Sequence, residues 1–216
     1  MKNLVLISLC LLLLSGCSLF LFNDLHMISR TSDERQDILS WFQRDADRYL
    51  YQATIDIYGN HFSGLLIIKP FSEDSYRTLF ITQLGMKIFD MEFFSGGDFK
   101  LHYCLDELNR RSIIKTLRND ISLMLENVSK TGRIKIMQEG QTGRMIIKSN
   151  GKTGVRYCLI DNKSNKINEL IQTRCLLKKL NIRFYSSEGI EPDSISISNY
   201  INKLNIHLIK LNETEP

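Results

Sequence analysis

The spacing of hydrophobic residues divides the chain into three parts. Residues 4–14 form a continuous apolar run, built mostly of Leu, Val and Ile. Between about residues 32 and 50 the apolar positions recur every three or four residues, which predicts an amphipathic helix with Ser32 or Thr31 available as its cap. Trp41 lies in this predicted helix, where we expect core packing rather than contact with a membrane interface. From residue 51 the apolar and polar positions alternate, as in strands with one dry and one wet face.

Five strand-like runs follow the predicted helix, at residues 51–58, 62–69, 76–83, 86–94 and 99–105. The breaks between them are short and carry Gly, Asn, Pro or Ser, which indicates an antiparallel meander. The last run alternates cleanly, with Phe99, Leu101 and Tyr103 on one face and Lys100, His102 and Cys104 on the other.

A long helix is predicted to interrupt the strands. We expect Asp106 as its N-cap and an end near residue 126, with one apolar stripe made of Leu108, Ile113, Leu117, Ile121 and Met124. Six further strands are predicted at residues 133–138, 144–148, 155–160, 167–173, 176–185 and 204–211, whereas residues 194–202 give no clear pattern.

Two of these later strands alternate as clearly as the run that ends at residue 105. One places Val155, Tyr157 and Leu159 on a single face, and the other does the same for Leu180, Ile182 and Phe184. The pattern therefore predicts a mainly β (α+β) protein with about eleven antiparallel strands. Two helices are too few to cover one face of so wide a sheet, so we expect a curved sheet with an apolar hollow.

The first 17 residues have the features of a lipoprotein signal peptide. Lys2 is basic, the apolar run follows, and the small-residue box Leu14-Ser15-Gly16 ends at Cys17. The Cys17 thiol is expected to take a diacylglycerol group and its freed amine an acyl chain such as palmitate, which together give a lasting membrane anchor. An uncleaved membrane helix that continues through residues 18–22 is the alternative, but it leaves the position of Gly16-Cys17 unexplained.

This interpretation sets the expected domain boundaries. Residues 1–16 are the signal peptide, 17–31 a lipidated tether and 32–216 a single domain. Ser18 after the acylated cysteine, instead of the Asp that retains lipoproteins in the inner membrane, favours the outer membrane, with the domain facing the periplasm.

Charge and cysteine content exclude several other classes of protein. Loss of Lys2 leaves 27 basic and 24 acidic residues without a basic block, so we expect no nucleic-acid binding. Cys10 leaves with the signal peptide, and Cys104, Cys158 and Cys175 have no spacing typical of a disulfide framework or a metal site. Small apolar fillers are the expected role, and one bridged pair stays open.

No catalytic constellation is present in the sequence, so we expect no enzyme, no metal and no cofactor. His26, His61, His102 and His207 are scattered, without close partners in sequence. Asp90 and Glu92 share one strand face, a pattern that suits acid–base chemistry and equally an ordinary solvated face.

The order of elements resembles the LolA/LolB lipoprotein carriers. The local resemblance is strongest from residue 62 to 125, in Phe62-Ser63-Gly64-Leu65-Leu66, Tyr76-Arg77-Thr78-Leu79-Phe80 and Leu84-Gly85-Met86-Lys87-Ile88-Phe89-Asp90, and Glu191-Pro192 followed by the last strand is similar too. The resemblance implies an unclosed antiparallel β half-barrel capped by helices, which shelters the acyl chains of a lipoprotein received from a periplasmic carrier protein.

On this resemblance the hollow is lined by Phe99, Leu101, Tyr103, Val155, Tyr157, Leu159, Leu180, Ile182 and Phe184. Ordinary core packing is the alternative for each of them. The family also inserts an apolar loop residue into the membrane, for which Phe71 is the candidate. A structural or assembly lipoprotein that holds a protein partner is the second hypothesis, and it predicts a plugged hollow with an apolar patch outside.

Overall fold

The computed structural model describes residues 25–29, 41–125, 134–140, 142–151, 153–175, 177–188 and 191–211. The predicted signal peptide, Cys17 and most of the predicted tether lie outside these ranges. Within them, no helix is long and apolar enough to cross a membrane.

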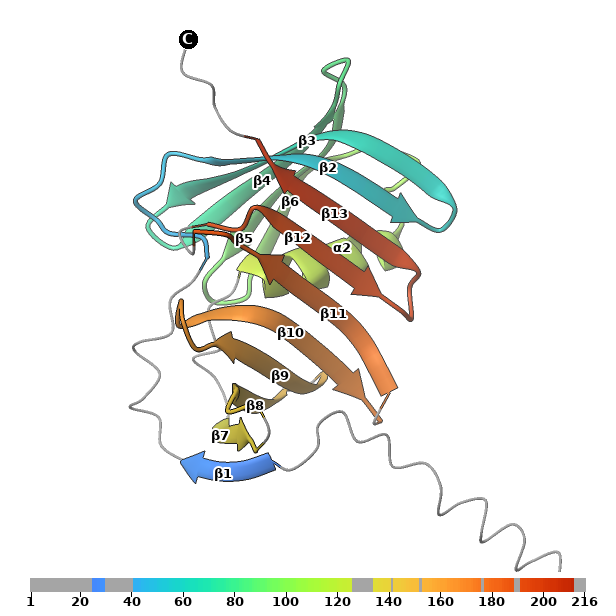
Figure 1. The fold of residues 1–216 in the computed structure, drawn as a ribbon. Helices are drawn as coiled ribbons and strands as arrows, with labels where there is room; N and C mark the ends of the chain where they lie inside the picture. The colour runs from blue at the N-terminus through green and yellow to red at the C-terminus, as the bar shows by residue number, and fades with distance from the viewer. Residues whose placement is uncertain are drawn as a thin grey trace, which may run out of the picture.

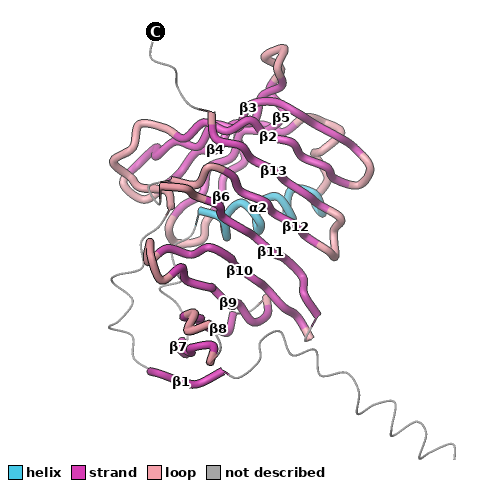
Figure 2. The backbone as a smooth tube through the Cα atoms, viewed as in Figure 1, coloured by secondary structure: helices cyan, strands magenta, loops and turns pink. Residues whose placement is uncertain are grey.

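The described residues form one antiparallel sheet and one helix (Figures 1 and 2). The strands are β1 (Leu25–Ser29), β2 (Tyr49–Ile57), β3 (Asn60–Ser72), β4 (Ser75–Thr82), β5 (Lys87–Phe94), β6 (Phe99–Cys104), β7 (Ile134–Glu139), β8 (Met145–Gly151), β9 (Gly154–Asp161), β10 (Lys166–Arg174), β11 (Leu177–Tyr185), β12 (Ser194–Asn199) and β13 (Leu204–Lys210), and the helix is α2 (Arg111–Leu125).

The strand order is β1-β7-β8-β9-β10-β11-β12-β13-β2-β3-β4-β5-β6. Strand β13 pairs with β2 along Leu204 to Lys210. This pairing joins the meander of β2 to β6 with the meander of β7 to β13, and with β1 beside β7 the sheet has thirteen strands. Strands β1 and β6 are its two edges, so the sheet does not close into a barrel. The predicted class, an unclosed antiparallel β half-barrel capped by helices, is therefore confirmed for the half-barrel, which carries one helix among the described residues.

All eleven predicted strands are present, and two more were not predicted. Strand β12 reads Ser-Ile-Ser-Ile-Ser-Asn, in which Ile195 and Ile197 are buried but the serines carry little strand preference. Strand β1 lies in the predicted tether and pairs with β7 at the sheet edge.

The first predicted helix is wrong over its described part. Residues 41–48 contain no helix, and β2 begins at Tyr49. The Tyr49 hydroxyl accepts a hydrogen bond from the Gln43 amide (2.5 Å) and donates one to the Gln43 carbonyl (3.1 Å), which engages backbone groups that a helix would use.

The second predicted helix is correct, but it begins later than expected. Residues 106–108 form a turn and α2 starts at Arg111, so Asp106 is not the N-cap. All five residues of the predicted apolar stripe are buried, namely Leu108, Ile113, Leu117, Ile121 and Met124.

Helix α2 follows β6, at one edge of the sheet, and precedes β7, which lies next to β1 at the other edge. The chain therefore crosses one face of the sheet between these strands, and α2 covers that face. Figure 1 shows it behind β12 and β13. Its buried apolar residues belong to one large apolar cluster with residues such as Tyr51, Phe80, Phe89 and Leu208 from both meanders. We call this the inner face of the sheet and the opposite side the outer face.

Candidate ligand-binding site

The inner face holds part of the predicted lining. Leu180, Ile182 and Phe184 belong to the main apolar cluster, and Phe99 and Leu101 are half-buried against it. Their positions fit both a ligand-lined hollow and an ordinary core, so ligand contact stays a prediction for these five residues.

Tyr103 does not share the face of Phe99 and Leu101, so this prediction is wrong. Leu101 is opposite Met91, whereas Tyr103 is opposite Asp90, because a bulge at His102 inserts one extra residue into β6. The bulge reverses the alternation. Cys104 is therefore buried in the main cluster and Tyr103 is 41% exposed on the outer face.

The predicted triad on β9 is also on the outer face. Leu159 forms a second, smaller cluster with Met137, Ile146 and Ile171, and Tyr157 packs against that cluster. Val155 lies on the same side of the strand, whereas Cys158 lies in the main cluster. Alternation correctly grouped Val155, Tyr157 and Leu159, but it cannot tell which face is inner when both faces carry apolar residues.

A cavity of about 660 Å³ opens at one end of the inner face. Its volume lies within the range typical of sites for small ligands. Its described lining combines two mostly buried aromatic residues with a polar rim, and comprises Trp41, Asp161, Lys163, Ser164, Asn168, Phe184, Tyr185, Ser186, Ser187, Glu188 and Asp193.

Trp41 forms the apolar floor of this cavity together with Phe184. The two rings are stacked, with centroids 6.1 Å apart. The Trp41 indole N–H donates to the Ile167 carbonyl (2.5 Å), and the Lys166 ammonium lies 4.5 Å from the indole centroid. Burial lowers the pKa of Lys166. Trp41 is the one tryptophan in the chain, so its fluorescence reports directly on the cavity.

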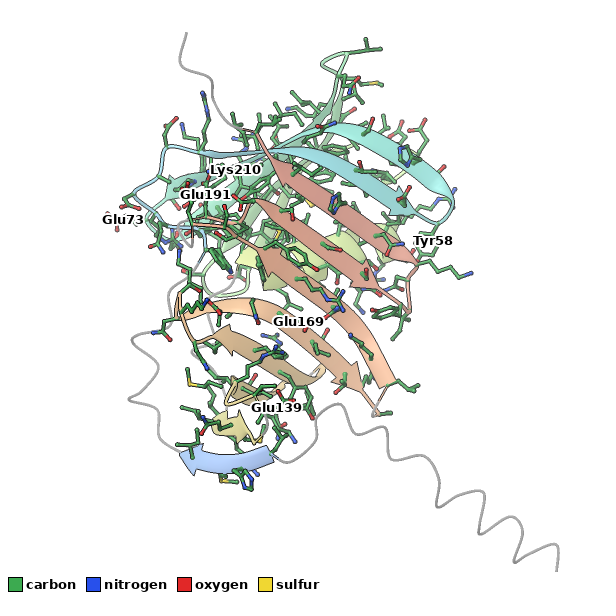
Figure 3. All side chains as sticks on the ribbon, viewed as in Figure 1. Tyr58, Glu73, Glu139, Glu169, Glu191 and Lys210 are labelled. Atoms are coloured by element: carbon green, nitrogen blue, oxygen red, sulfur yellow. The ribbon has the colours of Figure 1, made fainter. Side chains whose placement is uncertain are left out.

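The serines of the rim direct their hydroxyl groups at other protein atoms. Ser164 donates to the Asp161 carboxylate (2.8 Å), Ser187 donates to the Asp193 carboxylate (2.8 Å), and Ser186 donates to the Glu191 carbonyl (2.8 Å). The hydrogen bonds from Ser164 and Ser187 lower the pKa of Asp161 and of Asp193 respectively, so both carboxylates are ionised at neutral pH. Beside the rim, Glu191 and Lys210 form an ion pair (Figure 3).

Asn168 lines the cavity and carries a buried acceptor without a partner. It is the bulged residue of β10, between Ile167 and Glu169. Its Oδ1 atom is buried and accepts no hydrogen bond from the residues that the structure describes. A buried carbonyl oxygen without a donor costs about 1–3 kcal/mol, so a donor group that reached this atom would be favoured.

Asp90 and Glu92 bind neighbouring side chains on the outer face and do not line the cavity. Arg77 binds Asp90 with two hydrogen bonds of 2.8 Å, and Lys87 adds a third at 3.2 Å. Glu92 accepts hydrogen bonds from Ser75 (3.0 Å) and contacts His102 Nε2 (2.8 Å). These bonds, led by those of Arg77 and His102, lower the pKa of both carboxyl groups, which are too firmly paired to act as bases.

The remaining predicted residues lie at the surface or in the core. Phe71 is 54% exposed, with the Arg77 guanidinium 5.2 Å from its ring. All three described cysteines are free; Cys104 and Cys158 are buried, whereas Cys175 is exposed and is not a core filler. In the described ranges no three His, Cys, Asp or Glu side chains are grouped as metal ligands.

The comparisons with known proteins concern the fold. No protein-family model and no curated protein matches the chain. Two of the solved structures that are similar to it are 8% identical in sequence. One is described as an outer membrane lipoprotein-sorting protein domain from Vibrio parahaemolyticus, with a TM-score of 0.47 over 86% of this chain and 92% of that one. The other is a DUF1329 family protein from Desulfovibrio piger, with a TM-score of 0.43 over 78% and 85%.

Sequence reasoning missed most of the cavity. It placed Trp41 in the core and Phe184 in the hollow, but gave no signal for Asn168 or for the rim. The rim residues come from the β9–β10 turn and the segment after β11, and only the paired strands bring those two segments together.

Proposed function

We propose that this chain is a membrane-anchored, non-enzymatic lipoprotein that binds acyl chains or acylated proteins and takes part in lipoprotein localisation to the outer membrane. The observation that supports it best is the 660 Å³ cavity at the end of the apolar inner face, with Trp41 and Phe184 as its floor. Acyl chains suit such a surface because each buried methylene contributes about 0.8 kcal/mol without specific polar contacts. Acylation of Cys17 would hold this binding domain at the membrane that receives the cargo.

The test uses protein that lacks residues 1–17 and a dansyl-labelled diacyl lipopeptide as the probe. Energy transfer from Trp41 to the dansyl group is expected to saturate, and unlabelled lipopeptide should reverse it. Phe184→Ala should weaken binding about tenfold through loss of apolar contact. Tyr157→Ala, on the outer face, is the matched control and should leave affinity unchanged. Absence of saturable transfer in correctly folded protein rules out the carrier function.

A second candidate function is that of an assembly lipoprotein with a protein partner. Three large exposed residues favour it: Tyr58 in the β2–β3 turn and Tyr200 and Ile201 in the β12–β13 turn, which are 48%, 53% and 59% exposed. The two turns meet, since the Tyr58 hydroxyl donates to Asn202 Oδ1 at 3.4 Å. A stable complex with another envelope protein, together with no lipopeptide binding, supports this function instead.

A further inference from the structure

We infer that the cavity beside Trp41 selects acyl ligands by their head group and binds a nitrogen hydrogen-bond donor, an amide or an ammonium, in preference to a carboxylate. This inference rests on the proposed acyl-chain binding and adds the chemistry of the ligand's polar end.

The first argument is the charge of the rim. Among the described lining residues, Asp161, Glu188 and Asp193 are acidic and only Lys163 is basic. Lys166 contributes a second positive charge nearby, but its ammonium is engaged with the Trp41 ring at 4.5 Å. A carboxylate ligand would therefore meet an excess of negative charge close to an apolar floor, where repulsion is screened less than in bulk water.

The second argument is the balance of donors and acceptors. The hydroxyl groups of Ser164, Ser186 and Ser187 already donate to protein oxygens. Carboxylate oxygens of the rim are left to face a ligand, and the Asn168 Oδ1 atom, buried beside the cavity, has no donor among the described residues. A ligand N–H group satisfies these acceptors, whereas an ionised carboxylate has no proton to donate.

The third argument is position. Asn168 follows Ile167, whose carbonyl accepts the Trp41 indole N–H at 2.5 Å. Asn168 and the residue that binds the Trp41 indole are thus neighbours on one strand, β10. A ligand with its chain against Trp41 and Phe184 would have its head group beside Asn168.

The test measures displacement of the labelled lipopeptide by dodecanamide, dodecylammonium and dodecanoate, each below its micelle-forming concentration, at pH 7. Both nitrogen compounds are expected to compete at least tenfold better than dodecanoate. Asn168→Leu keeps the side-chain size and removes the acceptor, so it should lower amide affinity about tenfold and leave dodecanoate unchanged. The ranking of amide against ammonium shows whether an acylated amine or an aminolipid is the better match.

A second variant keeps the test valid if Asn168→Leu folds poorly. Glu188 is exposed on the rim, and Glu188→Gln should reduce the advantage of dodecylammonium over dodecanoate without affecting the fold. Equal competition by all three compounds, in wild type and variants, overturns the head-group inference, and it leaves the carrier function intact as long as the lipopeptide binds. An Asn168 amide satisfied by water alone would give that same result.

Discussion

At the scale of single residues, the most unusual side chain is Asp120, a carboxyl group buried between helix and sheet. It is 1% exposed, and both of its oxygens accept hydrogen bonds from the Asn199 amide, at 3.1 and 2.8 Å. Asn199 in turn accepts a hydrogen bond from the Asn202 backbone (3.1 Å), which links α2 to the β12–β13 turn. Burial raises the pKa of Asp120 from 3.8 to about 6.

This shift predicts a particular pH dependence of stability. The folded-state pKa exceeds the unfolded value, so the folded protein binds the Asp120 proton more tightly. The contribution of this group therefore falls as pH rises from about 4 to 6 and is unfavourable at pH 7. Asp120→Asn keeps an acceptor for Asn199 and should raise the free energy of unfolding at pH 7 by on the order of 2 kcal/mol.

Urea unfolding of wild type and variant between pH 4 and 8 measures this effect. The difference should be small at pH 4 and largest above pH 6. Asp98→Asn, at an exposed position, is the control for the loss of one negative charge. A constant difference across the range would mean that the Asp120 carboxyl does not titrate in this window.

At the scale of elements, the contact of β3 with β4 depends on a glycine. A Cβ atom at Gly64 would lie 1.9 Å from the Ile81 carbonyl oxygen, in backbone that cannot move without disturbing the ladder between the two strands. Gly64→Ala should therefore lower the free energy of unfolding by about 2–4 kcal/mol.

Thermal and urea unfolding measure this loss. Gly96→Ala is the matched control, because a Cβ atom there meets nothing within 4 Å and the residue does not have positive φ. It should change stability by less than about 0.5 kcal/mol. Equal stability of the two variants would show that the strands separate at little cost at Gly64.

The elements also show what a sequence can and cannot reveal. Alternation located eleven strands, because burial of one face imposes period two on residues such as Ile55 and Ile57. It failed where local preference was weak, as at the serines of β12, and where a bulge reversed the alternation, as at His102. It also could not place Tyr157 and Leu159, since the choice of face is made by the whole sheet.

At the scale of the whole molecule, the position of β1 at one edge of the sheet predicts how the domain is oriented relative to the membrane that holds its proposed lipid anchor. Only residues 18–24 separate Cys17 from β1, and a fully extended segment of that length spans about 30 Å or less. Acylated Cys17 would therefore keep the β1 edge near the membrane. The hairpin that joins β4 to β5 projects from the opposite end of the molecule, and the β3–β4 turn at Glu73 also lies away from β1 (Figures 1 and 3).

This direction bears on which apolar residue meets the anchoring membrane. Leu84, at the tip of the β4–β5 hairpin, is 95% exposed and Met86 is 53% exposed, whereas Ile28 on β1 is 55% exposed. We expect Ile28 to lie near the lipid surface and Leu84 to point away from it, where it is available to a second membrane or to the protein that delivers cargo. Phe71 as the inserting residue fits this arrangement only if the domain tilts strongly.

Fluorescent labels on the lipidated protein test the orientation. Single cysteines at Ile28, Phe71 or Leu84, in a background with exposed Cys175 changed to Ser, are labelled after reconstitution into vesicles that carry a nitroxide head-group quencher. Quenching should be strong for Ile28→Cys and weak for Leu84→Cys and Phe71→Cys. Strong quenching at Phe71 would support its insertion, and equal quenching at residues 28 and 84 would contradict the orientation. Because a short lipid tether limits rotation of the whole half-barrel, this one comparison decides which face of the molecule meets the membrane and which meets a partner.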